Sequence, residues 1–271
     1  MRCLVRDRTK AERLEGKGFE AHVGDVSDAH SLAGAGEGTE VAYYLVHSMA
    51  GGGDFAARER LGARNFARMA RSEGVDRVVY LGGLGDERAS EHLGSRHETA
   101  RVLSAHGPPL TYFRAAMVVG AGSESYRTLR YLVERLPVMI APSWLQTDTQ
   151  PIGIEATVEY LRRAPEVPES RGREVQIGGP DVLTYAAMLD RMADAMGARR
   201  RPKLPFPFVT PWLSSLWLGL VTPVDTSVAR PLVEGLRTAT VVTDPSGAEP
   251  FGVAPEPLDE ALRRALAEER A

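Results

Sequence analysis

Short apolar runs alternate with helix-length amphipathic stretches through the first half of the chain, and this alternation limits the possible folds most strongly. It predicts helices at 10–17, 54–73 and 95–105, and strands at 3–5, 20–23, 41–46, 78–81 and 110–113. Strand and helix in strict succession are typical of βαβ units, in which helices cover the faces of a parallel sheet. We therefore expect an α/β fold with a doubly wound parallel sheet. The run 41–46 is apolar throughout, which predicts that both faces of this strand are covered.

The strict alternation ends at about residue 120, since βαβ units no longer follow one another there. The remaining sequence predicts a late strand at 175–177. It also predicts helices at 126–136, 152–161, 184–196 and 258–269. The length of 271 residues allows one large domain or two small ones. We expect a core with the parallel sheet at 1–140 and a smaller α+β subdomain at 141–271, with 150–180 returning to the core sheet. The Pro-, Glu- and Arg-rich stretch 163–173 is predicted to be a linker.

The composition excludes several classes of protein. Hydrophobic residues make up 43% and charged residues 25%, which excludes disordered, collagen-like and coiled-coil chains. A formal net charge of −3 gives no field that would attract nucleic acid, so we expect no nucleic-acid partner. Cys3 is the only cysteine, which rules out an internal disulfide and any cysteine-paired metal site. We expect a cytoplasmic protein without a bound metal.

One long stretch without charge, residues 204–224, is interrupted by several prolines. Prolines in the interior break a continuous helix, so a membrane span is not expected. We expect a buried, pocket-lining or dimer-facing segment, which leaves a homodimer open, and an interfacial membrane contact is the alternative.

A series of short motifs follows the predicted strands. They are Arg6-Asp7, Gly24-Asp25-Val26, His47-Ser48-Met49, Tyr80-Leu81-Gly82-Gly83-Leu84, the stretch from His92 to Glu98, Arg114-Ala115, and Gln150-Pro151-Ile152. In this order and spacing they resemble the NmrA-like NAD(P)H-binding branch of the atypical short-chain dehydrogenases/reductases, over essentially the whole chain. The resemblance implies a Rossmann fold, a nicotinamide cofactor, a small-molecule substrate and hydride transfer to a small apolar carbonyl, enone or quinone.

One part of the family pattern has no counterpart in this sequence. Members of the family begin with a strand, a GxxGxxG turn and a helix, whose glycines let backbone N–H groups approach the cofactor pyrophosphate. This chain starts at what resembles their second strand, so the expected fold lacks its first βα unit. The glycines at 34–38, 51–53 and 82–85 are interpreted as turns. Either this unit lies upstream of Met1, which we favour, or the chain is a natural truncation with impaired cofactor binding.

The resemblance assigns the adenosine end of the cofactor to residues after the first strands. Arg6 is placed to pair with the 2′-phosphate of NADP, so NADP is preferred and NAD is possible; a solvated Arg-Asp-Arg loop is the alternative. Asp25 and the backbone N–H of Val26 are placed at the adenine. The alternative for Asp25 is an ordinary helix cap or turn, a role that Ser27 or Asp28 would fill equally well.

The remaining cofactor-binding residues implied by the resemblance follow later strands. Val46 and His47 lie at the carboxyl end of a predicted strand, where open α/β sheets bind ligands, and His47 could relay a proton. Gly82, Arg96, Arg114 and Ala115 are also assigned to cofactor binding, with Arg114 behind the nicotinamide. The alternative for Arg114 is an ion pair with an acid such as Glu98.

The catalytic pair of this superfamily is a Tyr followed by a Lys four residues later. Here His92 and Arg96 occupy the two positions. His92 could donate a proton, and Arg96 could bind a ribose hydroxyl or polarise a carbonyl, although its fixed charge does not titrate near neutral pH. An exposed loop histidine is the alternative for His92, and Tyr80 is expected in the core.

Several aromatic and amide side chains are candidate walls of an apolar substrate pocket, with the ordinary core of the second subdomain as the alternative. They are Trp144, Gln150, Phe206, Phe208, Trp212 and Trp217. Two other functions stay open. One is a non-catalytic NAD(P)-sensing or protein-interaction module, which the missing Tyr-Lys pair favours. The other is a degenerate, truncated family member without cofactor, whose sheet edge would be open.

Overall fold

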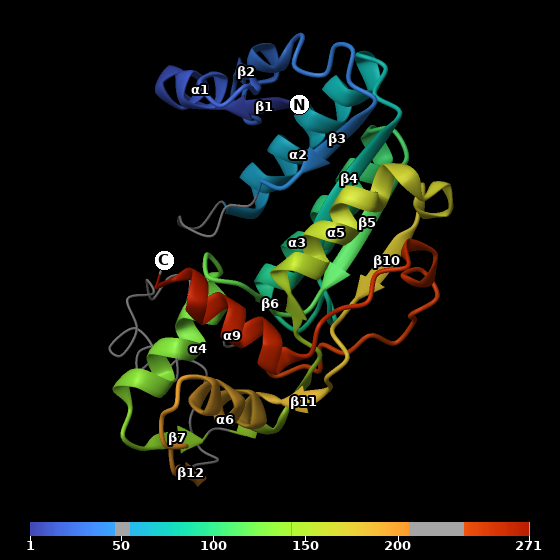
Figure 1. Ribbon diagram of the computed structural model, residues 1–271. Helices are drawn as coiled ribbons and strands as arrows, with labels where there is room; N and C mark the ends of the chain where they lie inside the picture. Colours follow the sequence, from blue (N-terminus) through green and yellow to red (C-terminus); the bar gives the residue numbers. More distant parts are fainter. Residues whose placement is uncertain (47–54, 142, 206–235, 271) are drawn as a thin grey trace. The chain divides into compact units, whose positions relative to one another are not determined.

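The computed structural model describes residues 1–46, 55–141, 143–205 and 236–270 (Figure 1). The chain divides into two compact units. Unit 1 comprises Met1–Leu81, His97–Tyr112 and Pro168–Glu174, and unit 2 comprises Gly82–Arg96, Phe113–Val167 and Val175–Ala271. Strands β4 and β5 begin in unit 1 and end in unit 2.

The elements follow the order that the sequence predicts. The strands are β1 Arg2–Val5, β2 Glu20–Val23, β3 Val41–Tyr44, β4 Arg77–Gly83, β5 Leu110–Ala115, β6 Val118–Val119, β7 Met139–Ala141, β8 Asp148–Thr149, β9 Ile152–Gly153, β10 Glu174–Ile177, β11 Leu183–Thr184 and β12 Lys203–Pro205. The α-helices are α1 Arg8–Glu15, α2 Phe55–Ser72, α3 Glu91–His106, α4 Glu124–Arg135, α5 Ile154–Arg163, α6 Tyr185–Ala195 and α9 Leu258–Glu268. Short 3₁₀ helices are η1 Ala29–Leu32, η2 Ser143–Gln146, η3 Ala164–Glu166, η4 Pro168–Ser170 and η5 Glu249–Phe251.

The sheets confirm the α/β class. A four-stranded sheet has the order β10-β5-β4-β3, in which β3 and β4 run parallel, and β1 and β2 form a separate parallel pair. In unit 1, α2 turns its apolar face to the core, where Tyr44, Phe66 and Tyr80 are buried, while Arg64 and Arg68 are exposed. This division matches the helical spacing of apolar residues in α2.

Strand β3 is shorter and more exposed than expected. It ends at Tyr44, and the side chains of Tyr43, Leu45 and Val46 are 39%, 51% and 45% exposed. The prediction that 41–46 is covered on both faces is therefore wrong for these residues. The side chains are exposed because β3 is the last strand of its sheet. An all-apolar sequence is instead typical of strands in the interior of a sheet.

Three predicted boundaries also need correction. Helix α3 begins at Glu91, because the Ser90 hydroxyl accepts a hydrogen bond from the Leu93 N–H at 3.2 Å, so His92 lies in a helix and not in a loop. Strand β5 continues to Ala115, which places Arg114 within it. The stretch 163–173 leads from unit 2 into unit 1, as predicted for a linker, but it is folded, since it forms η3 and η4 and buries Val167 and Ser170.

In unit 2, helices α4, α6 and α9 enclose one apolar core. Its fully or nearly fully buried members include Tyr126, Val133, Met192 and Leu262. The ring hydroxyl of Tyr126 donates to Glu269 at 3.1 Å, and Arg130 forms an ion pair with the same carboxylate. These contacts fasten the end of the chain to α4.

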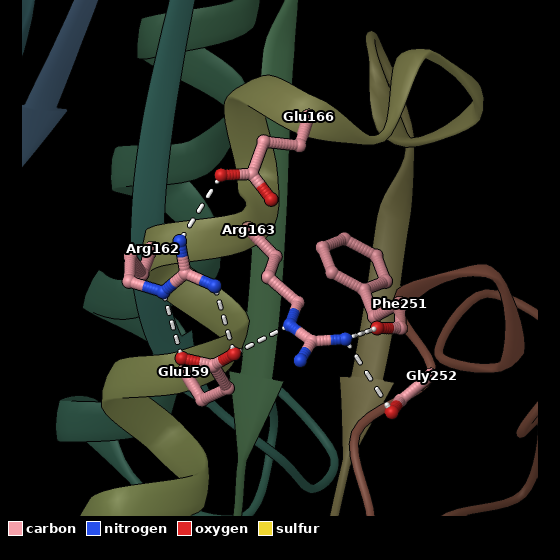
Figure 2. Close-up of polar contacts among 6 residues, drawn as sticks. All are labelled: Glu159, Arg162, Arg163, Glu166, Phe251 and Gly252. Carbon is pink, nitrogen blue, oxygen red and sulfur yellow. Dashed lines mark hydrogen bonds and ion pairs between the residues drawn. The ribbon is translucent and has the colours of Figure 1, made fainter.

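A second polar network fastens the C-terminal segment to α5 (Figure 2). Arg163 donates to the carbonyl oxygen of Phe251 at 2.7 Å and forms an ion pair with Glu159, which also accepts two hydrogen bonds from Arg162. Hydrogen bonds from Arg162, and then from Arg163, lower the pKa of Glu159 to about 2. The ring of Phe251 packs against Phe113, with ring centroids 5.3 Å apart, so polar and apolar contacts act on the same segment.

Within the described residues, the helices are too short or too polar for any of them to cross a bilayer.

Candidate functional site

Unit 1 brings two of the expected cofactor-binding side chains to one sheet edge. Val5 lies opposite Val23 in the parallel pair of β1 and β2, so both strands end together. Arg6 follows β1 directly, and Gly24 and Asp25 follow β2. The carboxyl ends of parallel strands are where open α/β sheets bind ligands. We call Arg6, Asp25 and Val26 the adenosine-side group.

The turn that carries Asp25 is fixed by hydrogen bonds. The Gly24 N–H donates to the Val5 carbonyl at 2.8 Å, and the Asp25 N–H donates to the Ser31 hydroxyl at 2.9 Å. Gly24 has no room for a side chain, because a Cβ there would lie 2.5 Å from the Ser31 carbonyl oxygen. Nothing in the sequence pointed to Ser31, since this contact depends on how η1 folds back on β2.

Asp25 is an ionised hydrogen-bond acceptor. Its carboxylate accepts from the backbone N–H of Ser27 at 2.8 Å and from the Ser27 hydroxyl at 2.7 Å. These bonds, and then the positive charge of Arg6, lower the pKa of Asp25, against the opposing effect of partial burial. The N-terminal cap of η1 is instead Asp28, which accepts from the His30 N–H at 3.0 Å. Asp25 therefore closes a turn and is not the cap of this helix.

Helix α2 also contacts the turn that carries Asp25. The Asn65 side-chain amide donates to the Val26 carbonyl at 2.9 Å, and a Cβ on Gly62 would lie 2.9 Å from the Val26 side chain. Val46 lies two residues beyond the end of β3. His47, and the motif residues Ser48 and Met49 with it, lie outside the described residues.

In unit 2, Arg114 fixes the loop that follows β4. Its guanidinium donates to the carbonyl oxygens of Gly83 at 3.3 Å and Gly85 at 2.6 Å, while the Leu84 N–H donates to the Ala115 carbonyl at 2.7 Å. Glu98, the alternative partner, pairs with Arg101 at 3.0 Å. These hydrogen bonds give Arg114 a positioning role at this loop.

Glycine is required in the loop after β4. Gly85 has a φ of +128°, which side chains rarely adopt, and a Cβ on Gly83 would come within 2.6 Å of Leu93. Gly82 begins the part of β4 that belongs to unit 2. Gly82 and Gly83 are therefore the last residues of strand β4, so the interpretation of the glycines at 82–85 as a turn is wrong for these two, and only Gly85 lies in the loop.

The predicted catalytic residues lie on α3. His92 and Arg96 are four residues apart on this helix, a spacing that places two residues on one face. The position of the His92 side chain lies outside what the structure describes. Tyr80 is 1% exposed and stacks on Tyr112 at 5.3 Å, so it is a core residue as expected.

Two of the predicted pocket walls fall within the described residues. The side-chain amide of Gln150 hydrogen-bonds to two backbone groups. It donates to the Gly179 carbonyl at 2.7 Å and accepts from the Val242 N–H at 2.9 Å. Trp144 lies on η2 against the apolar core of unit 2. The other four, Phe206, Phe208, Trp212 and Trp217, lie outside the described residues.

The adenosine-side group fits the adenosine end of a nicotinamide cofactor. An ionised carboxylate accepts hydrogen bonds from the adenine amino group, and a guanidinium pairs with a 2′-phosphate. No strand, GxxGxxG turn and helix in succession occurs among residues 1–46, 55–141, 143–205 and 236–270. The described chain therefore supplies the chemistry for the adenosine and leaves the pyrophosphate without the usual glycine turn.

Comparison with known proteins identifies the fold. Residues 1–119 match the model of a family described as NAD(P)H-binding. An NADPH-dependent quinone oxidoreductase from Escherichia coli, solved with NADPH, is 17% identical, with a TM-score of 0.68 over 96% of this chain and 88% of that one. The chain has the fold of the atypical short-chain dehydrogenases/reductases.

Two other solved structures share this short-chain dehydrogenase/reductase fold. A nucleoside-diphosphate-sugar epimerase from Staphylococcus aureus is 16% identical, with a TM-score of 0.74 over 97% of this chain and 90% of that one. A triphenylmethane reductase from Citrobacter sp., complexed with NADP(H), is 16% identical, with a TM-score of 0.72 over 97% of this chain and 90% of that one. No curated protein sequence matches the chain. The Rossmann-like fold is confirmed, and the NmrA-like subtype stays a prediction.

Proposed function

We propose that this chain binds NADP(H) and reduces a small apolar carbonyl, enone or quinone. The observation that carries the proposal is the adenosine-side group, in which Arg6 and an ionised Asp25 lie at one sheet edge. The match of residues 1–119 to an NAD(P)H-binding family and the fold shared with NADPH-dependent reductases support it.

The adenosine-side group has three roles in this proposal. Arg6 pairs with the 2′-phosphate, which makes NADP the preferred cofactor over NAD. The Asp25 carboxylate accepts from the adenine amino group, and the Val26 N–H donates to the adenine ring. Val46 and His47, which follow β3 in the sequence, are also assigned to the cofactor.

The nicotinamide side takes its residues from the sequence motifs of unit 2. Gly82, Arg114 and Ala115 form the loop and strand end beside the ring, and Arg96 binds a ribose hydroxyl or polarises the substrate oxygen. The bound cofactor supplies a hydride to the substrate carbon. The substrate oxygen then needs a proton, which we assign to the His92 imidazolium.

Cofactor binding is tested by titrating the chain with NADPH and with NADH and following the fluorescence of the reduced nicotinamide. We expect NADPH to bind about 10 to 100 times more tightly, which is the worth of a charge-assisted arginine–phosphate contact. Arg6→Ala should remove this difference. Arg8→Ala, on an exposed arginine that pairs with Glu12 at 3.5 Å, is the matched control and should keep it. If neither nucleotide binds, the proposal is wrong.

A second candidate function is NAD(P) sensing without catalysis, which the replacement of the Tyr-Lys pair by His92 and Arg96 favours. The two functions differ in turnover. NADPH oxidation by menadione, lost in His92→Ala and in Arg96→Ala, would establish the reductase. Tight NADPH binding without oxidation by any quinone, enone or carbonyl tried would establish the sensor.

Two further expectations complete the proposal. The single cysteine favours a cytoplasmic location. A homodimer is the proposed assembly, and light scattering at micromolar concentration checks it.

A further inference from the structure

Both hydrogen bonds that hold the Asp25 carboxylate end on the same one of its two oxygens. The backbone N–H of Ser27 and the Ser27 hydroxyl donate to Oδ1, at 2.8 and 2.7 Å. An ionised carboxylate accepts about four hydrogen bonds, two on each oxygen. Oδ1 is therefore filled by Ser27, and Oδ2 is the oxygen that a ligand can use.

The turn that carries this carboxylate is open to solvent. Asp25 and Val26 are half-buried, and Ser27 is exposed. The turn follows β2 at the end of the parallel pair of β1 and β2, which is the edge where open α/β sheets bind ligands. A ligand therefore reaches the Asp25 carboxylate from solvent without displacing the core.

The peptide group between Val26 and Ser27 is held from both sides. Its N–H donates to Asp25 Oδ1, and its carbonyl oxygen accepts from the Asn65 amide of α2 at 2.9 Å. A carbonyl that accepts a hydrogen bond polarises its peptide group and strengthens the N–H of that group as a donor. The backbone donor that holds Asp25 is thus itself fixed by helix α2.

The Ser27 hydroxyl restricts the motion that the backbone bond leaves free. The last torsion of an aspartate side chain is broad, so a carboxylate held by one donor still rotates about its Cβ–Cγ bond. The hydroxyl adds a second donor to the same oxygen, and its length of 2.7 Å is that of a strong bond to a charged acceptor. The two donors together set the direction of Oδ2.

A fixed acceptor beside a backbone donor distinguishes between purine bases. Adenine presents an amino group, which donates, next to the ring nitrogen N1, which accepts. Hypoxanthine presents a carbonyl oxygen next to an N1–H, which is the reverse pattern. Oδ2 and the Val26 N–H match adenine and place like groups opposite each other with hypoxanthine, which gives discrimination by repulsion. A carboxylate that rotates freely could instead turn to the N1–H of hypoxanthine.

We propose that Ser27 is a positioning residue that makes the adenosine-side group selective for adenine, because its hydroxyl and its N–H direct Oδ2 of Asp25 to the adenine amino group. This inference rests on the proposed function and adds the base specificity of the same site. Ser27 acts through Asp25 and does not itself contact the base.

The test compares NADPH with its hypoxanthine analogue, in which a carbonyl oxygen replaces the amino group of the base and N1 carries a proton. Binding of both is followed by the fluorescence of the reduced nicotinamide. We expect the native chain to bind NADPH about 30 times more tightly than the analogue, and Ser27→Ala to reduce this ratio to about five or less. Ser27→Thr keeps both donors and should restore the native ratio.

The ratio separates positioning from a general weakening of the turn, because a loosened turn affects both nucleotides alike. Ser72→Ala is the matched control. It removes another serine hydroxyl of unit 1, which donates to the Met69 carbonyl at 3.0 Å at the end of α2, and it should leave the ratio unchanged.

A second readout needs no cofactor. The hydrogen bonds from Ser27 lower the pKa of Asp25. Ser27→Ala should therefore raise the pKa of Asp25, and Ser27→Thr should leave it unchanged, in an NMR titration of the Asp25 carboxyl carbon.

The outcomes distinguish the two proposals. A native ratio in Ser27→Ala, a ratio that Ser27→Thr does not restore, or an Asp25 pKa that ignores Ser27→Ala overturns the role of Ser27 and leaves NADPH binding intact. Equal affinity of the native chain for the two nucleotides overturns it as well. Failure of NADPH to bind the native chain overturns the proposed function, even where Ser27→Ala raises the pKa of Asp25.

Discussion

At the scale of single residues, Arg114 shows how the structure changes the meaning of a motif. The resemblance places Arg114 behind the nicotinamide, and its visible contacts are with the carbonyl oxygens of Gly83 and Gly85. The two descriptions differ in mechanism. In the structure, the guanidinium fixes a backbone loop, and any effect on cofactor or substrate passes through that loop.

We predict that Arg114→Lys lowers the free energy of unfolding by about 1–3 kcal/mol, because lysine keeps the charge and lacks the fork that reaches two carbonyls. Urea denaturation measures this loss. Arg101→Lys, on an exposed arginine paired with Glu98, is the control and should change stability by no more than about 0.5 kcal/mol. An Arg114→Lys protein as stable as the native one, with weaker NADPH binding, would instead favour direct contact with the cofactor.

Sequence motifs identified the chemically distinctive residues of the site and missed their supports. Asp25 and Arg6 stand out because they follow predicted strands. Ser31 and Asn65, which bond to the same turn, lie 6 and 39 residues away from their partners. No local pattern predicts such contacts, since they arise only when η1 folds back on β2 and α2 packs against η1.

At the scale of elements, the apolar periodicity predicted most strands and helices of the first half. Its errors have physical causes. The sequence predicts a start of α3 at residue 95, whereas the structure has it at Glu91, where the Ser90 cap and the burial of Leu93 outweigh the low helix propensity of Gly94. The apolar run at 41–46 predicts where β3 lies in the sequence. It does not predict which strand pairs with β3, because pairing depends on residues far away in the chain.

The junction after β2 provides a test at this scale. We predict that Gly24→Ala costs about 1–3 kcal/mol of stability, because its Cβ would lie 2.5 Å from a backbone oxygen that cannot rotate away. The new methyl group must push η1 from β2 and displace Asp25, so NADPH binding should weaken as well. Thermal unfolding and nucleotide titration measure the two effects.

The matched control is Gly122→Ala, where nothing lies within 4 Å of the added Cβ. That protein should be as stable as the native chain or slightly more so, because alanine restricts the unfolded chain. A Gly24→Ala protein with native stability and native NADPH affinity would mean that the turn adjusts freely, and that Asp25 is not fixed as the structure shows.

At the scale of the whole molecule, the expected cofactor residues divide between the two units. Arg6, Asp25 and Val26 belong to unit 1, whereas Gly82, Arg96, Arg114 and Ala115 belong to unit 2. The adenosine-side group is complete within unit 1, so it should bind the matching part of the cofactor alone. This allows the adenosine end to be tested without the pyrophosphate turn that the described chain lacks.

We predict that 2′,5′-ADP, which is the phosphorylated adenosine end of NADP, stabilises the protein. A ligand at 100 times its Kd adds about 2.7 kcal/mol to the free energy of unfolding, which raises Tm by about 5–10 °C in a chain of this size. Hydrogen exchange should slow at residues 20–26 of unit 1. Arg6→Ala should abolish both effects, and 5′-AMP, which lacks only the 2′-phosphate, should bind the native chain as weakly as 2′,5′-ADP binds the variant. Equal stabilisation by the two nucleotides would contradict the role of Arg6 and leave Asp25 and Val26 as the adenosine contacts of an NAD-binding protein.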